Sequence, residues 1–164
     1  MARPLTLRLL CLLLLAAPSV LPASSAAREI VSYAIVQNDG SLRVQGKTIR
    51  LFGTYIPDTS RICRRDFRPA ICGTRAANAL ETKIQGFVRC TPVAQLRDRS
   101  LSAICTVEEG SILDPPVDLG AWLIELGLAV ATPDAPFEYG VLERLARTNR
   151  RGVWGFQVDG IRIR

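Results

Sequence analysis

The sequence contains no histidine, and Lys47 and Lys83 are its only lysines. The first absence excludes acid–base catalysis by histidine and metal sites that use imidazole ligands. Basic residues still outnumber acidic ones by 21 to 15, for a net charge of +6, and nearly all of that excess is arginine. The chain is therefore mildly basic, and arginine and carboxylates are the charged groups available for chemistry.

The sequence also lacks a Cys-x-x-Cys motif, which makes redox catalysis and a compact zinc site poor interpretations. Cys11 lies inside an N-terminal apolar run. The other four, Cys63, Cys72, Cys90 and Cys105, form an even set that suits an oxidising compartment. Four cysteines allow three connectivities. If the runs that contain Cys90 and Cys105 are neighbouring strands, these two pair, and Cys63 and Cys72 close a loop.

No apolar run after the N-terminal region approaches the roughly 20 residues that a membrane span needs. The N-terminal region itself begins with Arg3 and Arg8, continues with the apolar run Leu9–Ala17 and ends in small residues. This pattern predicts a cleaved secretory signal peptide over residues 1–27, with an uncleaved anchor as the alternative. We therefore expect a secreted or periplasmic protein with no transmembrane span in its mature part.

The predicted mature chain, residues 28–164, has the length of a single domain, and we assume a monomer. Strand patterns interrupted by turns, then a helical pattern, then two further strand patterns follow one another along the chain. The strands are expected at 29–37, 41–44, 47–53, 86–90 and 101–105, and the helix at 73–84. This order predicts an α+β fold built on a five-stranded OB-fold barrel.

Two further helices are expected after the strands. Asp118 is a suitable N-cap for a helix over 119–126, and Gly127 is a suitable residue to end it. The last helix is predicted from Phe137 to Asn149. Trp122 and Trp154 occupy apolar positions, so both are predicted to belong to the core.

Short motifs spread over residues 29–156 add a resemblance to this pattern. They are Asp39-Gly40, Ile49-Arg50-Leu51-Phe52-Gly53, Pro57-Asp58, Cys72-Gly73, Ala103-Ile104-Cys105, Asp118-Leu119-Gly120-Ala121-Trp122-Leu123, Gly127-Leu128-Ala129 and Arg150-Arg151-Gly152-Val153-Trp154-Gly155. Their order and spacing resemble those of staphylococcal-nuclease-like (thermonuclease) domains. The resemblance implies an OB-fold and, in active members, calcium-dependent hydrolysis of DNA and RNA.

The same resemblance shows where the chain departs from an active member. Ser41 and Tyr55 stand where the family has its two metal-binding aspartates, and Asp58 stands where it has a general-base glutamate. Arg50 matches the first catalytic arginine. A calcium ion would be left with Asp39 and Asp58, which is a poor set for an ion that takes six to eight oxygens.

The second catalytic arginine falls on Ser100 in an ungapped alignment and on Arg99 after a shift of one residue. Two hypotheses follow. The first is a catalytically degenerate domain, with no cofactor, that binds nucleic acid, an acidic polysaccharide or a protein partner. The second is an active calcium-dependent nuclease that uses Arg50, Asp58 and Arg99.

Two arginine groups are candidates for binding an anionic polymer. The first consists of Arg61, Arg64, Arg65 and Arg68. The second consists of Arg144, Arg147, Arg150 and Arg151, with Glu138 and Glu143 available as ion-pair partners. The alternative for both groups is an ordinary solvated surface.

Overall fold

The computed structural model describes residues 28–58, 61–65, 68–72, 74–110 and 114–155. The predicted leader, residues 1–27, lies outside these ranges, as does the tail after residue 155. Among the described residues, no helix combines the length and the apolar character that a membrane crossing requires.

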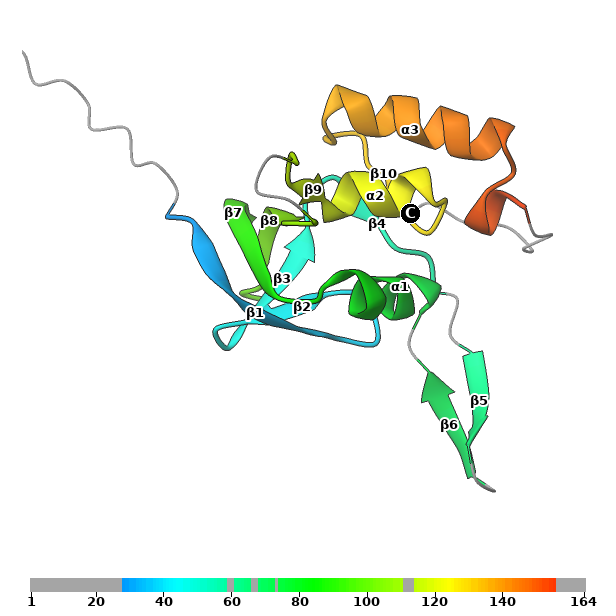
Figure 1. The fold of residues 1–164 in the computed structure, drawn as a ribbon, viewed down its shortest axis with the longest axis horizontal. Helices are drawn as coiled ribbons and strands as arrows, with labels where there is room; N and C mark the ends of the chain where they lie inside the picture. Colours follow the sequence, from blue (N-terminus) through cyan, green and yellow to red (C-terminus); the bar gives the residue numbers. More distant parts are fainter. Residues whose placement is uncertain (1–27, 59–60, 66–67, 73, 111–113, 156–164) are drawn as a thin grey trace, which may run out of the picture.

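Five strands form a closed barrel, as predicted (Figure 1). They are β1 (Ile30–Val36), β2 (Leu42–Val44), β3 (Lys47–Leu51), β7 (Phe87–Gln95) and β8 (Leu101–Val107). Antiparallel pairing gives the order β3-β2-β1-β7-β8, and a parallel pairing of β3 with β8 closes the barrel. In that closing pair, Arg50 lies opposite Ser102. The fold is therefore an α+β, OB-like barrel.

Buried side chains alternate along the barrel strands, as expected for a sheet with one face inside. Leu42 and Val44 of β2 and Ile49 and Leu51 of β3 point into the core, whereas the residues between them are more exposed. The helices add the fully buried residues Leu80, Leu119, Leu123 and Ile124. One hydrophobic core therefore joins the barrel to its helices.

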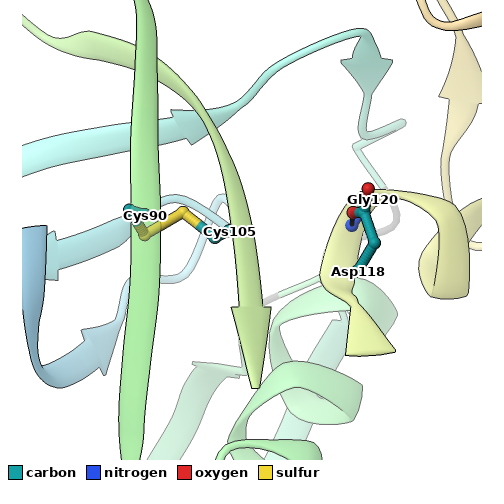
Figure 2. Close-up of a disulfide and its surroundings, with 4 residues drawn as sticks. All are labelled: Cys90, Cys105, Asp118 and Gly120. Atoms are coloured by element: carbon teal, nitrogen blue, oxygen red, sulfur yellow. Dashed lines mark hydrogen bonds between the residues drawn. A yellow bond between two sulfur atoms is a disulfide. The ribbon is translucent and has the colours of Figure 1, made fainter. Parts of the chain in front are cut away.

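A disulfide joins β7 to β8 inside this core. Cys90 and Cys105 are directly opposed in the antiparallel pair, and both are fully buried (Figure 2). The predicted Cys90–Cys105 pairing is thus confirmed. The predicted Cys63–Cys72 bridge falls on side chains outside the described ones.

Three α-helices pack on the barrel: α1 (Arg75–Lys83), α2 (Leu119–Glu125) and α3 (Phe137–Thr148). The Thr74 side chain caps α1 by accepting a hydrogen bond from the Ala77 amide at 3.1 Å. Asp118 caps α2, as predicted, because its carboxylate turns back to accept from the Gly120 amide at 2.8 Å (Figure 2). Gly127 follows α2 with a φ of +68°, a conformation that favours glycine.

Helix α3 lies outside α2 and is held by two polar contacts (Figure 1). The Tyr139 hydroxyl donates to the second oxygen of Asp118 at 2.8 Å. Burial, reinforced by the bond to Asp118, raises the pKa of Tyr139 well above its ordinary value, so the phenol stays protonated. Glu143 accepts from the Ala131 amide at 2.7 Å, which ties α3 to β10 (Val130–Ala131).

The prediction for the tryptophans needs a correction, since both are only half-buried. Trp122 packs against the core, with the Lys83 ammonium 4.9 Å from its ring centre. Trp154, in the short helix η1 (Gly152–Trp154), lies 4.0 Å from the Arg147 guanidinium. Long cationic side chains therefore cover faces of indole rings that the core does not enclose.

A second correction concerns the segment before α1, which the sequence predicts to be a loop. It contains two paired strands, β5 (Arg61–Arg65) and β6 (Arg68–Cys72), which project from the barrel as a separate hairpin (Figure 1). These strands pair only with each other in the described sheets. Because proline is rare inside strands and β6 contains Pro69, the sequence signal for strands is weak in this segment.

The remaining described strands are short. β4 (Thr54–Tyr55) pairs with β10, and β9 (Val117–Asp118) pairs with the end of β8.

Candidate functional site

A shallow pocket of about 200 Å³ lies on the barrel surface beside β3. It is lined by Asp39, Gly40, Ser41, Arg50, Leu51, Thr54, Tyr55 and Ile56. The turn after β1, strand β3 and strand β4 supply these residues. The structure thus brings together Asp39, Arg50, Ser41 and Tyr55, the last two being the positions where the resemblance predicts aspartates.

Arg50 lies between two carboxylates. Its Nη2 is 3.3 Å from Asp98 Oδ2, and its Nη1 is 3.7 Å from Asp39 Oδ2. All three side chains are about half exposed, so solvent screens both ion pairs and each contributes little stability. We call Arg50, Asp39 and Asp98 with Ser41 and Ser100 the Arg50 cluster.

Asp39 is fixed by the turn in which it lies. Its Oδ1 accepts from the Ser41 amide at 2.9 Å and lies 2.6 Å from the Ser41 hydroxyl. Gly40 has a φ of +82°, and an added Cβ there would lie 2.6 Å from Ile56 Cδ1. Partial burial acts to raise the pKa of Asp39, but the hydrogen bonds from Ser41 and the charge of Arg50 outweigh it and hold that pKa below its ordinary value.

Asp98 lies in a turn of the same kind. Its Oδ1 accepts from the Ser100 amide at 3.0 Å and lies 2.5 Å from the Ser100 hydroxyl, while its Oδ2 faces Arg50. The hydroxyl and amide of Ser100, with a smaller contribution from Arg50, lower the pKa of Asp98. Two Asp-x-Ser turns from distant parts of the chain therefore meet at one arginine.

This arrangement determines how the pocket responds to anions. Two ionised carboxylates surround one guanidinium, so the Arg50 cluster carries a net negative charge. A phosphate entering here would have to compete with Asp39 and Asp98 for the Arg50 donors. The geometry therefore suits a self-contained ion-pair cluster better than an anion site.

The other predicted catalytic residues lie outside the pocket. Asp58 follows β4, is exposed, and is not among the residues that line it. Arg99 is exposed in the turn before β8 with a φ of +65°, and it does not line the pocket either. Its neighbour Asp98 makes the contact to Arg50 instead.

The donor set at this pocket does not fit calcium. Tyr55 contributes a hydroxyl in place of a carboxylate, and the Ser41 hydroxyl is engaged with Asp39. Among the described residues there is no group of three or more histidine, cysteine, aspartate or glutamate side chains that could hold a metal ion. A hard cation that prefers several charged oxygens would find too few of them here.

The two arginine groups differ in surroundings. The first, Arg61, Arg64, Arg65 and Arg68, lies on the projecting β5–β6 hairpin, where only the backbone is described. In the second group, Arg147 pairs with Glu143, as the sequence suggested, and Arg151 lies 3.3 Å from Glu125. These pairs favour a solvated surface for the second group.

Sequence reasoning missed Asp98. The repeat of Asp39-Gly40-Ser41 as Asp98-Arg99-Ser100 was a usable signal, because both tripeptides place a carboxylate two residues before a serine in a turn.

The fold and the pocket define an OB-like domain that carries an ion-pair cluster on its barrel. Comparison of the chain with protein-family models finds no match, and comparison with curated proteins finds none either.

Proposed function

We propose that this protein is an exported, staphylococcal-nuclease-like domain that binds an anionic polymer without hydrolysing it. The likeness to that family rests on the order of the short motifs along the chain, and the closed barrel with three helices is compatible with it. The observation that carries the loss of catalysis is the position of Arg50 between Asp39 and Asp98.

The chemistry of phosphodiester hydrolysis explains why this observation matters. A metal ion or positively charged donors must stabilise the charge that develops on the phosphate in the transition state. The resemblance aligns Ser41 and Tyr55 with the family's two metal-binding aspartates; both residues line this pocket, and its arginine is already paired. The pocket therefore lacks the positive field that the reaction needs.

The net charge of +6 and the arginine-rich hairpin support a polyanionic ligand. Removal of the predicted leader takes away Arg3 and Arg8 and no acidic residue, which leaves a net charge of +4. The hairpin contributes Arg61, Arg64, Arg65 and Arg68 on an element that projects from the barrel (Figure 1). Basic residues on a projecting arm can contact phosphate or sulfate groups along a polymer.

The test uses purified protein, residues 28–164, with labelled single-stranded DNA, RNA and heparin. We expect no cleavage of either nucleic acid, with calcium or with chelator, and salt-sensitive binding of at least one polymer in fluorescence anisotropy. Cleavage that requires calcium and disappears in Asp58→Ala would overturn the proposal in favour of an active nuclease. Failure to bind any of the three polymers would overturn it as well.

A hairpin variant tests which element binds. Replacement of Arg64, Arg65 and Arg68 by glutamine should weaken heparin binding and reduce its salt dependence. Arg144→Gln, on α3, serves as the control and should leave binding nearly unchanged.

A further inference from the structure

Strand β1 carries apolar side chains on both faces, although only one face lines the core. The outward residues Val31, Tyr33 and Ile35 are 42%, 66% and 69% exposed, and Phe87 on the adjacent β7 is 56% exposed. Tyr33 and Phe87 are directly opposed across the two strands. Their ring centres are 4.2 Å apart, with the ring planes tilted by 32°. We call these four residues the aromatic face.

The position of β1 limits what can bind there. β1 pairs with β7 along Ile30–Tyr33 and with β2 along Ala34–Val36, so each half of the strand already has a hydrogen-bonded neighbour in the barrel. A ligand on this face lies across the outward side chains rather than along the backbone. Contiguous exposed apolar groups of this kind mark an interaction surface more often than an ordinary solvated one.

Basic residues border the aromatic face. Arg43 is exposed and lies directly opposite Ile35, and Arg89 lies directly opposite Val31. Arg28 and Lys47 line a shallow hollow that also includes Val31. The acidic residues nearby are Glu29 and Glu108, which lie 3.0 Å and 3.6 Å from Arg89. Arg89 is thus paired with two carboxylates, as Arg50 is, and the positive charge at the border comes from Arg28, Arg43 and Lys47.

A hollow of about 400 Å³ adjoins Phe87 and Val31, two residues of the aromatic face. Its lining includes Phe87, Arg89, Thr106 and Glu108, so it combines an aromatic wall with hydrogen-bonding groups. A planar ring that continued the Tyr33–Phe87 stack would meet both kinds of surface.

We propose that the aromatic face binds single-stranded nucleic acid, with bases stacking on Tyr33 and Phe87 and phosphates contacting Arg43, Arg28 and Lys47. This inference rests on the proposed function and names its ligand class and surface. A single strand fits because its bases are free to stack on exposed rings, and because its backbone is a chain of negative charges that suits a basic border. A duplex keeps its bases stacked inside and would contact only the border.

The experiment measures binding of fluorescein-labelled oligodeoxythymidylate, about twenty nucleotides long, in chelator. Loss of both rings in Tyr33→Ala/Phe87→Ala should weaken binding by about thirtyfold or more, since two stacked bases together contribute at least roughly 2 kcal/mol. Tyr33→Phe/Phe87→Tyr should retain wild-type affinity. Phe137→Ala removes a ring that is also exposed, at the start of α3, and is the matched control.

A second measurement does not depend on variants. Photocrosslinking of the wild-type protein to an oligonucleotide with 5-iodouracil, followed by peptide mapping, should label β1 and β7. Crosslinks confined to the β5–β6 hairpin would overturn the inference.

Three other results distinguish failure of the inference about the aromatic face from failure of the proposed function. Oligonucleotide binding that is unchanged in Tyr33→Ala/Phe87→Ala overturns only the aromatic face. Binding of heparin without binding of the oligonucleotide also overturns the inference and leaves a polyanion-binding domain. Calcium-dependent cleavage overturns the proposed function, whereas the chelator experiment still reports on the aromatic face.

Discussion

The Arg50 cluster and the aromatic face lie on the same barrel but use their side chains in opposite ways. In the cluster, Arg50 is flanked by Asp39 and Asp98, and each carboxylate is also bonded to a serine. On the aromatic face, large apolar side chains remain open to solvent. The comparison shows that Arg50, which the family resemblance predicts to be catalytic, has its donors engaged by two carboxylates. The aromatic face, for which the sequence motifs make no prediction, retains exposed apolar groups that a ligand could cover.

The largest effect on stability should come from removal of the Cys90–Cys105 disulfide. This bond joins the two strands that support both regions, because β7 carries Phe87 and β8 follows the Asp98 turn. Cys90→Ala/Cys105→Ala should lower the free energy of unfolding by about 3 kcal/mol, the value expected when a loop of this size is no longer closed. The two cysteines are fifteen residues apart. Denaturant unfolding under oxidising conditions measures the change, and a loss below about 1 kcal/mol would contradict the prediction.

A somewhat smaller effect is expected at Asp118. This residue makes the same contact to an amide two residues ahead as Asp39 and Asp98, but it also accepts from buried Tyr139. Asp118→Ala should lower the free energy of unfolding by about 2 kcal/mol, because it removes the cap of α2 and the hydrogen-bond partner of Tyr139. Asp39→Ala is the matched control and should cost less in the same thermal or denaturant unfolding, because its turn is more exposed.

Substitution of Arg50 tests the comparison most directly. Arg50→Gln should change the free energy of unfolding by less than about 1 kcal/mol, since both ion pairs are half exposed. It should also leave oligonucleotide binding within about twofold of wild type, a change well below the 1.4 kcal/mol that corresponds to tenfold. A large loss of affinity, measured by anisotropy, would show that the Arg50 cluster binds the anion and would contradict the contrast between the two regions.

The smallest expected effect is on the thermal stability of the protein at acidic pH. Asp39 and Asp98 have folded-state pKa values below their ordinary value near 4, so the stability they contribute is present above that pH and is lost as the pH falls through the folded values. Thermal unfolding between roughly pH 5 and pH 2 should therefore show a smaller decrease in Tm for Asp39→Asn/Asp98→Asn than for wild type. Equal decreases would show that other carboxylates dominate the acid response.

Most of the fold could be predicted, because it follows from local patterns. Alternating apolar residues around Leu42 and Ile49, the cap at Asp118 and the glycine at 127 each determine their own element. The β5–β6 hairpin was not predicted, since its segment is rich in arginine and contains Pro69, which weakens the strand signal. The candidate site was only partly predictable, because ion pairs depend on which turns the closed barrel brings together.

The sequence by itself determined the barrel strands and the capped helix α2, since periodicity and capping act over a few residues. It predicted the opposition of Cys90 to Cys105 only on the condition that their two strands are neighbours, which the fold supplies. The tertiary structure alone decided that Asp98 meets Arg50 across 48 residues and that Tyr33 stacks on Phe87. The first contact requires the turn before β8 to lie beside β3 after the two strands pair in parallel, and the second requires the register of β1 against β7. Both registers are set by the packing of the whole barrel rather than by neighbouring residues.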